Sequence, residues 1–285
     1  MNNFGVVLEG GAMRGVFTAG ILDFFLDNDV NIHNVLAVSA GAFVGMNYVS
    51  KQRGRIMESV VEPMAHERIM SLGNLIKHGE FWDMDKLFGT IPKERAPFDF
   101  ESFKNSGKRF ITSTVNCDTG ELVYHDSFKD LDEFLHICRV ANSLPLLSKI
   151  GYIDGAPMLD GGMADAIPIA KALEENWDKT IVIFTRERDY RKSPKGDIYN
   201  SGMVRFLYRK YKGLLKVIDE RPSKYNDSIE LINRLEDEGK IFVFRPEGII
   251  LKNNERDADA LKEYHRKGYE IAARRFEELK TFLNA

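Results

Sequence analysis

The fold of this chain is decided near its start, where residues 5–49 read GVVLEGGAMRGVFTAGILDFFLDNDVNIHNVLAVSAGAFVGMNYV. Two short apolar runs, 5–8 and 35–38, have the length and the β-branched content of buried strands. Each is followed by a turn of small residues and then by apolar residues at helical spacing, over 16–26 and 40–49. This repeated strand–turn–helix unit predicts an α/β fold with a central, mainly parallel sheet flanked by helices.

The rest of the chain continues the alternation of strands and helices. Two alternating runs around a Gly-containing turn predict a β-hairpin over residues 109–125. Further strands are expected at 180–185 and 241–244, and further helices at 131–142, 167–175, 204–218, 226–238 and 257–283. Because no Pro/Gly/Ser-rich linker divides the 285 residues, we expect one domain over 1–285, with a core over about 5–185 and a helical, basic part over about 186–285.

Composition excludes several classes of protein. Lys and Arg number 40 and Asp and Glu number 43, so the bulk charge argues against a nucleic-acid-binding protein. The two cysteines, Cys117 and Cys138, are too few for a disulfide framework and lack zinc-site spacing, which indicates a reducing compartment. No signal peptide and no membrane-spanning run are evident. We therefore expect a cytoplasmic protein, at most peripheral to a membrane, without cofactor or metal.

The second strand-to-helix turn, Ala37-Val38-Ser39-Ala40-Gly41, is close to the nucleophile-elbow pattern G-x-S-x-G. That turn requires small residues two before and two after the serine, and Ala37 and Gly41 both meet the requirement. The Ser39 hydroxyl would then project above the sheet at a helix N-terminus, whose N–H groups stabilise a developing anion. The alternative is that Ser39 only caps the helix, a role for which serine is a preferred residue.

The first strand-to-helix turn, EGGAMRG at residues 9–15, exposes a row of backbone N–H groups. Such a row suits an oxyanion or a phosphate equally well. With Ala12 in the place of the middle glycine, the turn is also similar to the dinucleotide-binding G-x-G-x-x-G. That motif expects an acid at the end of the second strand, where this chain has Ser39. A third interpretation is an ordinary tight turn with Arg14 on a solvated face.

The third element is Asp160-Gly161-Gly162, which follows a strand-like stretch. A carboxylate at the end of a strand, followed by two glycines, can face a neighbouring active-site turn. Asp-Gly is also a common turn dipeptide, and for the preceding Asp154-Gly155 an ordinary turn is our prediction.

In their order, the loop at 9–15, the elbow at 37–41 and the Asp-Gly-Gly at 160–162 resemble the patatin-like phospholipase family. The family pattern is an acid-Gly-Gly-Gly-x-Arg-Gly oxyanion loop, a G-x-S-x-G elbow and a later D-G-G or D-G-A. The resemblance covers residues 5 to about 169 and includes the ANSLP segment at 141–145. This chain departs from the pattern at Glu9 for Asp, Ala12 for the third Gly and Ala37 for the first elbow Gly.

This resemblance implies a three-layer patatin-like fold and a lipid acyl-ester hydrolase of the phospholipase or lysophospholipase type, with a Ser-Asp dyad and an acyl-enzyme intermediate. Carried onto this sequence, Ser39 is the nucleophile and Asp160 the base. The oxyanion hole is formed by backbone N–H groups of Gly10, Gly11 and Ala12, and the supporting residues are Arg14, Gly15, Gly41, Gly161 and Gly162. A Ser-acid-His triad is the alternative, with His265 the histidine in the matching chain order.

A basic stretch follows the expected core. From Arg186 to Lys224, twelve Lys or Arg residues stand against five Asp or Glu residues, a local net charge of +7. Within it, the segment that begins at Val204 and ends at Ile218 interleaves aromatic and aliphatic with basic residues, which predicts a basic amphipathic helix suited to a membrane surface. A helix that covers the core with its charged face in solvent fits the same pattern.

Three functions therefore compete. The first is metal-independent hydrolysis of a lipid ester. The second is binding of a lipid or an anion without turnover, and the third is binding of a nucleotide through the Gly-rich loop.

Overall fold

The computed structural model describes residues 3–67, 69–195, 197–248 and 250–285. The prediction that the N-terminus is not a signal peptide includes residues 1 and 2, which lie outside the described residues. Its centre is one eight-stranded sheet with the order β5-β6-β3-β2-β1-β7-β8, and β4 pairs with β3 beside this path. The strands are β1 (Phe4–Leu8), β2 (Asn34–Ala37), β3 (Arg109–Asn116), β4 (Leu122–His125), β5 (Gly151–Ile153), β6 (Ala156–Asp160), β7 (Lys179–Ile183) and β8 (Ile241–Phe244).

The sheet is parallel at its centre and antiparallel toward one edge. β3, β2, β1, β7 and β8 run parallel, whereas β4 and β6 pair antiparallel with β3, and β5 with β6. The predicted hairpin is therefore confirmed as β3 and β4. The predicted turn at Asp154-Gly155 is confirmed as well, because these two residues join β5 to β6 and both have positive φ, 50° and 78°.

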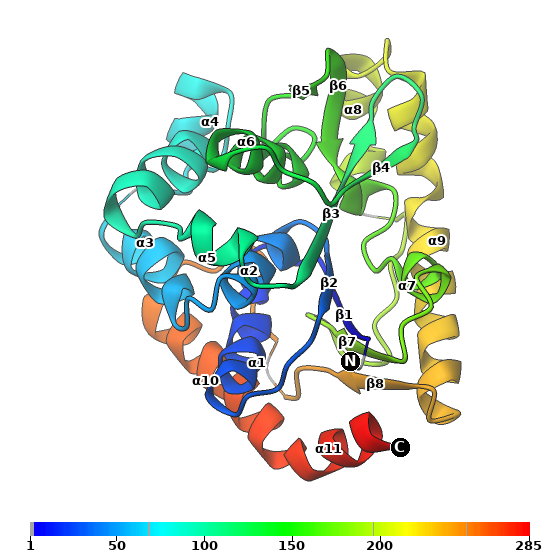
Figure 1. The fold of residues 1–285 in the computed structure, drawn as a ribbon. Coiled ribbons are helices and arrows are strands. Elements are labelled where there is room, and N and C mark those ends of the chain that lie inside the picture. The colour runs from blue at the N-terminus through cyan, green and yellow to red at the C-terminus, as the bar shows by residue number, and fades with distance from the viewer. Residues whose placement is uncertain (1–2, 68, 196, 249) are drawn as a thin grey trace.

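Helices cover both faces of the sheet (Figure 1). One face carries α1 (Gly15–Asp27), α2 (Ala40–Val49) and α10 (Ala258–Arg274), and the other carries α7 (Ile169–Glu174) and α9 (Lys212–Asp237). The remaining helices are α3 (Glu62–His66), α4 (Leu72–His78), α5 (Phe100–Lys104), α6 (Leu131–Ala141), α8 (Gly202–Leu207) and α11 (Phe276–Asn284). Tighter or wider helical turns occur at η1 (Ala12–Arg14), η2 (Met57–Val61), η3 (Lys86–Arg95), η4 (Gly161–Met163) and η5 (Ile198–Asn200).

The two faces of the sheet bury different apolar clusters, because successive residues of a strand point to opposite faces. Val6 and Leu8 of β1 pack with residues of α1 and α10, whereas Val7 packs with residues of α7 and α9. This three-layer arrangement confirms the predicted fold class. It also places the carboxyl ends of β1 and β2, and the turns that follow them, side by side at one edge of the sheet.

The prediction of one basic helix over 204–218 is wrong. α8 ends at Leu207, α9 begins at Lys212, and the turn between them buries the side chains of Tyr208 and Tyr211. The reason lies in the hairpin against which this turn packs. The N–H groups of Gly213 and Leu214 donate to carbonyls of the β3–β4 turn, so α9 starts where the chain meets that turn.

The C-terminal helices also differ from the expected ranges. α9 continues through Pro222 to Asp237, where the sequence predicts a separate helix at 226–238. The expected helix at 257–283 is two helices, because the backbone leaves helical geometry at Arg275, with φ −100° and ψ 15°. Across the described parts of the chain, no helix is both long and apolar enough to span a bilayer.

Candidate active site

Ser39 lies on the turn between β2 and α2 with φ 55° and ψ −126°. A positive φ is uncommon for a residue that has a side chain, and such sparsely populated geometry costs about 1–3 kcal/mol. The Ser39 side chain makes no capping hydrogen bond to α2. Helix capping therefore does not explain this serine, whereas the strained turn of a nucleophile elbow does.

Small side chains allow this turn to form. A Cβ on Gly41 would lie 2.7 Å from the carbonyl oxygen of Leu8, and a Cβ on Gly10 would lie 3.0 Å from the Cβ of Ser39. Both distances are shorter than such atoms normally tolerate. Ala37 is fully buried within β2. Alanine at the first position of the elbow is therefore compatible with the turn.

Asp160 is the last residue of β6 and is only 1% exposed. Its Oδ1 accepts a hydrogen bond from the Gly162 N–H at 2.7 Å, whereas Oδ2 makes no hydrogen bond of standard geometry with any described residue. Burial raises the pKa of Asp160 to about 6, and the nearby Ser39 hydroxyl acts in the opposite direction. A carboxylate with a raised pKa is a better proton acceptor at neutral pH than an exposed aspartate.

Ser39 lies where two cavities meet. One is narrow, about 80 Å³, and is lined mainly by apolar side chains of η1, α1, α2, η2 and η3 and of the segments that precede η2 and η3. The other is polar, about 550 Å³, and contains Asp160. Ala12, Ser39 and Leu144 line both cavities. An ester carbonyl placed at Ser39 would have an apolar cavity on one side and a polar cavity on the other.

The loop after β1 presents free backbone donors beside this junction. The N–H groups of Gly11 and Ala12 make no hydrogen bond with the described residues, whereas that of Gly10 donates to the Ala166 carbonyl at 3.4 Å. Of the three predicted donors, Gly10 is thus already engaged. The N–H of Ala40, next to Ser39, also has no partner in the described chain. The sequence analysis did not include Ala40, although the residue after the nucleophile commonly donates to the oxyanion.

Glu9 holds this loop against two distant elements. Its carboxylate is buried, and Oε2 accepts hydrogen bonds from the Thr185 N–H at 2.5 Å and from the Thr185 hydroxyl at 2.8 Å. Oε1 accepts a hydrogen bond from the Tyr225 hydroxyl of α9 at 2.7 Å. The sequence analysis missed both partners, because they lie 176 and 216 residues away and belong to no local motif.

The remaining predicted supporting residues lie around the same turns. Arg14 is only 8% exposed and lines the polar cavity, so its placement on a solvated face is wrong. Burial, and to a smaller extent the charge of Arg186, lowers the pKa of the Arg14 guanidinium. A Cβ on Gly15 would lie 3.2 Å from the Cβ of Ala40. Gly161 packs against Ser113 and Gly162 against Val38, which fixes the strand end that carries Asp160.

Histidine does not take part in this arrangement. None of the six histidines, all of which are described, lines either cavity. His265, the candidate for a triad, instead contacts Asp23 of α1 through Nε2 at 2.8 Å. Nor does the described chain contain a group of three or more His, Cys, Asp or Glu side chains arranged to hold a metal ion.

A serine on a strained strand-to-helix turn is the nucleophile elbow of α/β hydrolases, and here a buried carboxylate, without a histidine, lines the same cavity. Comparison with family models identifies the family to which the chain belongs. The model described as patatin-like phospholipase matches residues 6–173, more than half of the chain, and the chain belongs to this family. A second model, described as a domain of unknown function (DUF6363), matches residues 211–284.

Two individual proteins are similar to this chain. The uncharacterized protein YjjU of Escherichia coli (strain K12) is 25% identical over 247 residues, which cover 85% of this chain and 68% of that protein. Among solved structures, VipD from Legionella pneumophila has a TM-score of 0.47 at 12% sequence identity, and the match covers 100% of this chain and 67% of VipD.

Proposed function

We propose that this protein hydrolyses acyl esters of lipids, with Ser39 as the nucleophile and Asp160 as the base. The observation that carries the proposal is the position of Ser39, on a strained turn at the junction of an apolar and a polar cavity. The apolar cavity suits an acyl chain, and the polar cavity suits the alcohol part of the ester and the water that later attacks.

In the proposed mechanism, Asp160 accepts the proton of the Ser39 hydroxyl while the oxygen attacks the ester carbonyl. The tetrahedral oxyanion accepts hydrogen bonds from the free N–H groups of Gly11, Ala12 and Ala40. The carbon–oxygen bond to the alcohol then breaks, and Asp160 returns the proton to the leaving alcohol. Asp160 next takes a proton from water, whose oxygen attacks the acyl-enzyme, and the fatty acid leaves as Ser39 is protonated again.

Covalent labelling tests the nucleophile directly. A fluorophosphonate should label the wild-type protein at Ser39 and should not label Ser39→Ala, which keeps the small side chain that the elbow needs. Hydrolysis of a short-chain nitrophenyl ester should disappear in Ser39→Ala and fall nearly as far in Asp160→Asn, because the amide cannot accept the proton. A His265→Gln variant serves as the control for the triad alternative and should retain activity.

Two outcomes would replace this proposal. A wild-type protein that binds lipid vesicles but neither reacts with the fluorophosphonate nor hydrolyses the ester is a lipid-binding protein. A protein that shows neither reaction but is stabilised against thermal unfolding by a nucleotide uses the Gly-rich loop as a phosphate site.

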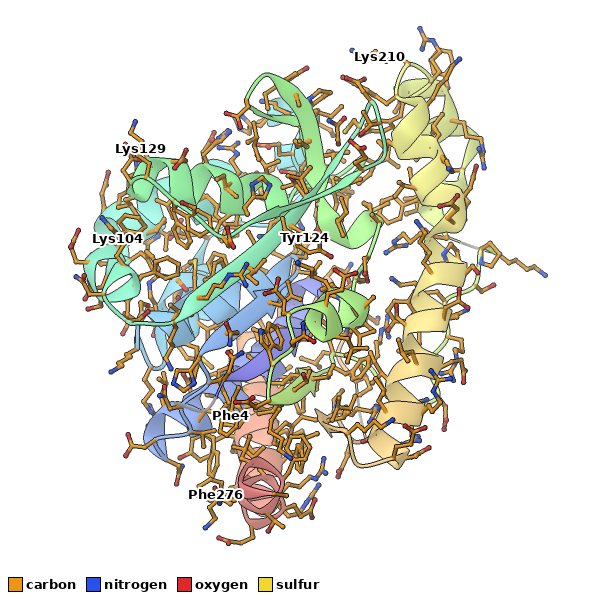
Figure 2. All side chains as sticks on the ribbon, turned by 45° about the vertical axis from the view of Figure 1, so that its right-hand side comes forward. Phe4, Lys104, Tyr124, Lys129, Lys210 and Phe276 are labelled. Carbon is orange, nitrogen blue, oxygen red and sulfur yellow. The ribbon has the colours of Figure 1, made fainter. Side chains whose placement is uncertain are left out.

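We also propose that the surface around α8 contacts an anionic membrane. Its large apolar side chains are exposed, at 57% for Met203, 66% for Phe206 and 52% for Leu207. Basic side chains lie among them, and the Arg209 guanidinium lies 4.8 Å from the centre of the Phe206 ring. Lys210 lies at the tip of this end of the molecule (Figure 2). Apolar side chains that insert and cations that meet anionic lipid are the two components of peripheral membrane binding.

The membrane proposal is tested by sedimentation with vesicles that contain anionic lipid. Arg209→Gln with Lys210→Gln should weaken binding and make the remaining binding less sensitive to salt, because each cation near the surface contributes about 1 kcal/mol. Lys104→Gln with Lys129→Gln, on the opposite side of the view in Figure 2, is the matched control. If the two double variants sediment equally with the vesicles at low and at high salt, the α8 surface does not bind the membrane and is only exposed to solvent.

A further inference from the structure

The polar cavity beside Ser39 is lined by more cations than carboxylates. Its basic residues are Arg14, Arg186, Arg191, Lys192, Lys195 and Arg221, and its acidic residues are Glu9, Asp160 and Asp197. Two of the acidic residues are already engaged by other groups. Glu9 accepts hydrogen bonds from Thr185 and Tyr225, and Asp197 pairs with Arg221 at 2.9 Å. The cavity is therefore a site of positive potential next to the reacting carbonyl.

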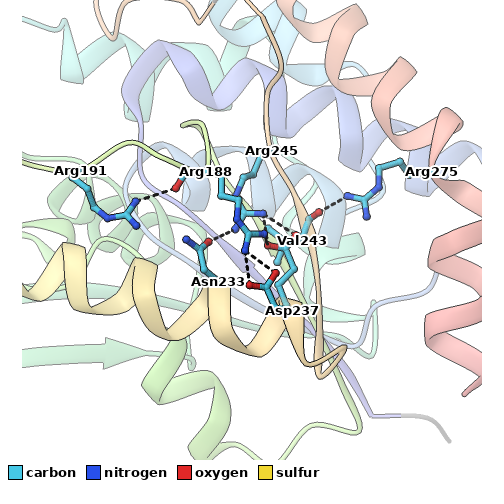
Figure 3. Close-up of polar contacts among 8 residues, drawn as sticks. Arg188, Arg191, Asn233, Asp237, Val243, Arg245 and Arg275 are labelled. Carbon is cyan, nitrogen blue, oxygen red and sulfur yellow. Dashed lines mark hydrogen bonds and ion pairs between the residues drawn. The ribbon is translucent and has the colours of Figure 1, made fainter.

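Four of the cations have no counter-charge in the described chain, and of these Lys195 is exposed whereas the other three are buried or half-buried. Arg14, Arg186 and Lys192 have no carboxylate within ion-pair distance anywhere in the described residues. Two other arginines of the same loop are paired with acids of α9: Arg188 with Glu236 at 2.8 Å and with Asp237 at 2.7 Å, and Arg191 with Glu230 at 2.5 Å. Figure 3 shows Arg188 bound to Asp237 in this way. Arg188, which does not line the cavity, and Arg191, which does, are thus neutralised, whereas Arg186 and Lys192 of the same loop reach the cavity unpaired.

Aromatic rings hold two of these unpaired cations in place. The Lys192 ammonium lies 3.9 Å from the centre of the Tyr225 ring, and the Arg186 guanidinium lies 4.2 Å from the centre of the Tyr190 ring. The two rings meet edge to face at 5.9 Å. A cation on an aromatic face is positioned by the ring while its N–H groups stay available for a ligand. Burial and the charge of Arg221 lower the pKa of Lys192 to about 7, as expected for an ammonium that lacks a counter-anion.

We propose that this cavity binds the phosphate of the ester substrate, and that the enzyme prefers acyl esters whose phosphate head group carries no cation. The inference rests on the proposed function and names its substrate class. A phosphate would accept charge-assisted hydrogen bonds from Arg186, Lys192 and Arg14 while the acyl chain lies in the apolar cavity. A head group that ends in a quaternary ammonium would place its charge among like charges and would bind less well.

The proposal also gives a role to the part of the chain that the patatin-like model does not cover. Arg186 and Lys192 follow the matched residues 6–173, and Arg221 and Tyr225 lie within residues 211–284, which match the domain of unknown function. These elements complete the polar cavity from the side of α9. Apart from Arg14, head-group recognition would thus be supplied by the C-terminal part of the chain, whereas the nucleophile and the base belong to the N-terminal part.

The test compares three lipids with the same acyl chain: a monoacylglycerol phosphate, the corresponding phosphocholine ester and the neutral monoacylglycerol. For the wild-type protein, kcat/KM for the phosphate monoester should exceed that for the phosphocholine ester by about tenfold or more. Lys192→Gln and, separately, Arg186→Gln should bring this ratio close to one. Arg188→Gln, the same charge change at the paired arginine of the same loop, should keep the wild-type ratio.

The outcomes separate this inference from the proposed function. Absence of nitrophenyl ester hydrolysis by the wild-type protein would overturn the proposed function itself. Normal hydrolysis of that ester with equal kcat/KM for the three lipids would overturn the head-group inference alone. Inorganic phosphate and ATP are tested by thermal unfolding. One further outcome would also overturn the inference. In it, phosphate or ATP stabilises the wild-type protein but not Lys192→Gln, and the wild-type protein shows no selectivity among the three lipids. The cavity would then be a site for a free phosphate compound.

Discussion

Replacing Asp160 with asparagine should remove a cost to the stability of the folded protein that grows as the pH rises to neutral. Burial raises the pKa of Asp160 from 3.8 to about 6, so the folded protein holds this proton more tightly than the unfolded chain does. Below pH 3.8 the carboxyl is protonated in both states. As the pH rises toward 6, the unfolded chain ionises first, and the free energy of unfolding falls. At 1.36 kcal/mol per pKa unit, the full cost above pH 6 is about 3 kcal/mol.

Asparagine removes this pH-dependent cost. Asparagine also introduces a cost that does not depend on pH, because its Nδ2 occupies the place of Oδ2, which has no hydrogen bond of standard geometry. The constant part cancels when unfolding by urea is measured for both proteins at pH 4.5 and at pH 7.5. The free energy of unfolding of Asp160→Asn minus that of the wild type should be larger at pH 7.5 by about 2 kcal/mol. Ser39→Ala, which keeps the carboxyl, should retain a fall in stability with rising pH, at least as large as in the wild type, because the hydroxyl that lowers the pKa of Asp160 is lost.

An equal difference at the two pH values would show that Asp160 does not titrate in this range in the folded protein, and the reasoning would fail. The same ionisation predicts the activity profile, because only the carboxylate can accept the proton of Ser39. For a soluble ester, kcat/KM should fall in acid with an apparent pKa of about 6. A profile that is flat from pH 5 to pH 8 would contradict the role of Asp160 as the base.

Three further predictions concern the oxyanion loop and the independence from metal. Gly11→Ala should lower turnover of a nitrophenyl ester by about 10²-fold or more, because the added Cβ would lie 2.5 Å from the Thr185 hydroxyl and displace the backbone N–H donors of the loop. If this variant keeps the turnover of the wild type, the oxyanion lies elsewhere. Tyr225→Phe keeps the ring but leaves Oε1 of Glu9 buried without a donor, so urea unfolding should show a loss of about 1–3 kcal/mol, and unchanged stability would refute this. EDTA should leave ester hydrolysis unchanged, because the described residues offer no ligand cluster; loss restored by calcium would be the opposite result.

Local sequence was sufficient for the strands and helices of residues 5–49 and for the two turns at the centre of the site. The small residues of 9–15 and 37–41 predicted tight strand-to-helix turns, and the structure has them there. These features are decided by a few neighbouring residues, since steric crowding and helical or strand periodicity act over short distances. The alternation of strands and helices predicted the fold class for the same reason.

Other features of the site depend on which distant segments pack together. Asp160 enters the polar cavity because β6 pairs with β3, whose other neighbour β2 carries Ser39 at its end. Motif resemblance could nominate this aspartate, but strand pairing is what places it. The Glu9 contacts to Thr185 and Tyr225 are of the same kind, because each joins residues far apart in the chain.

The basic stretch shows most clearly what the sequence by itself determined and what it left to the tertiary structure. The charge count identified an excess of cations from Arg186 to Lys224, and apolar spacing predicted one helix at 204–218. Packing against the β3–β4 turn divides that helix, and the acids of α9 neutralise Arg188 and Arg191 while Arg186 and Lys192 stay unpaired at the cavity. The sequence determines how many charges a segment has, but only the folded chain decides which of them meet a counter-charge, because ion pairs form over a few ångströms between residues that are far apart in the sequence.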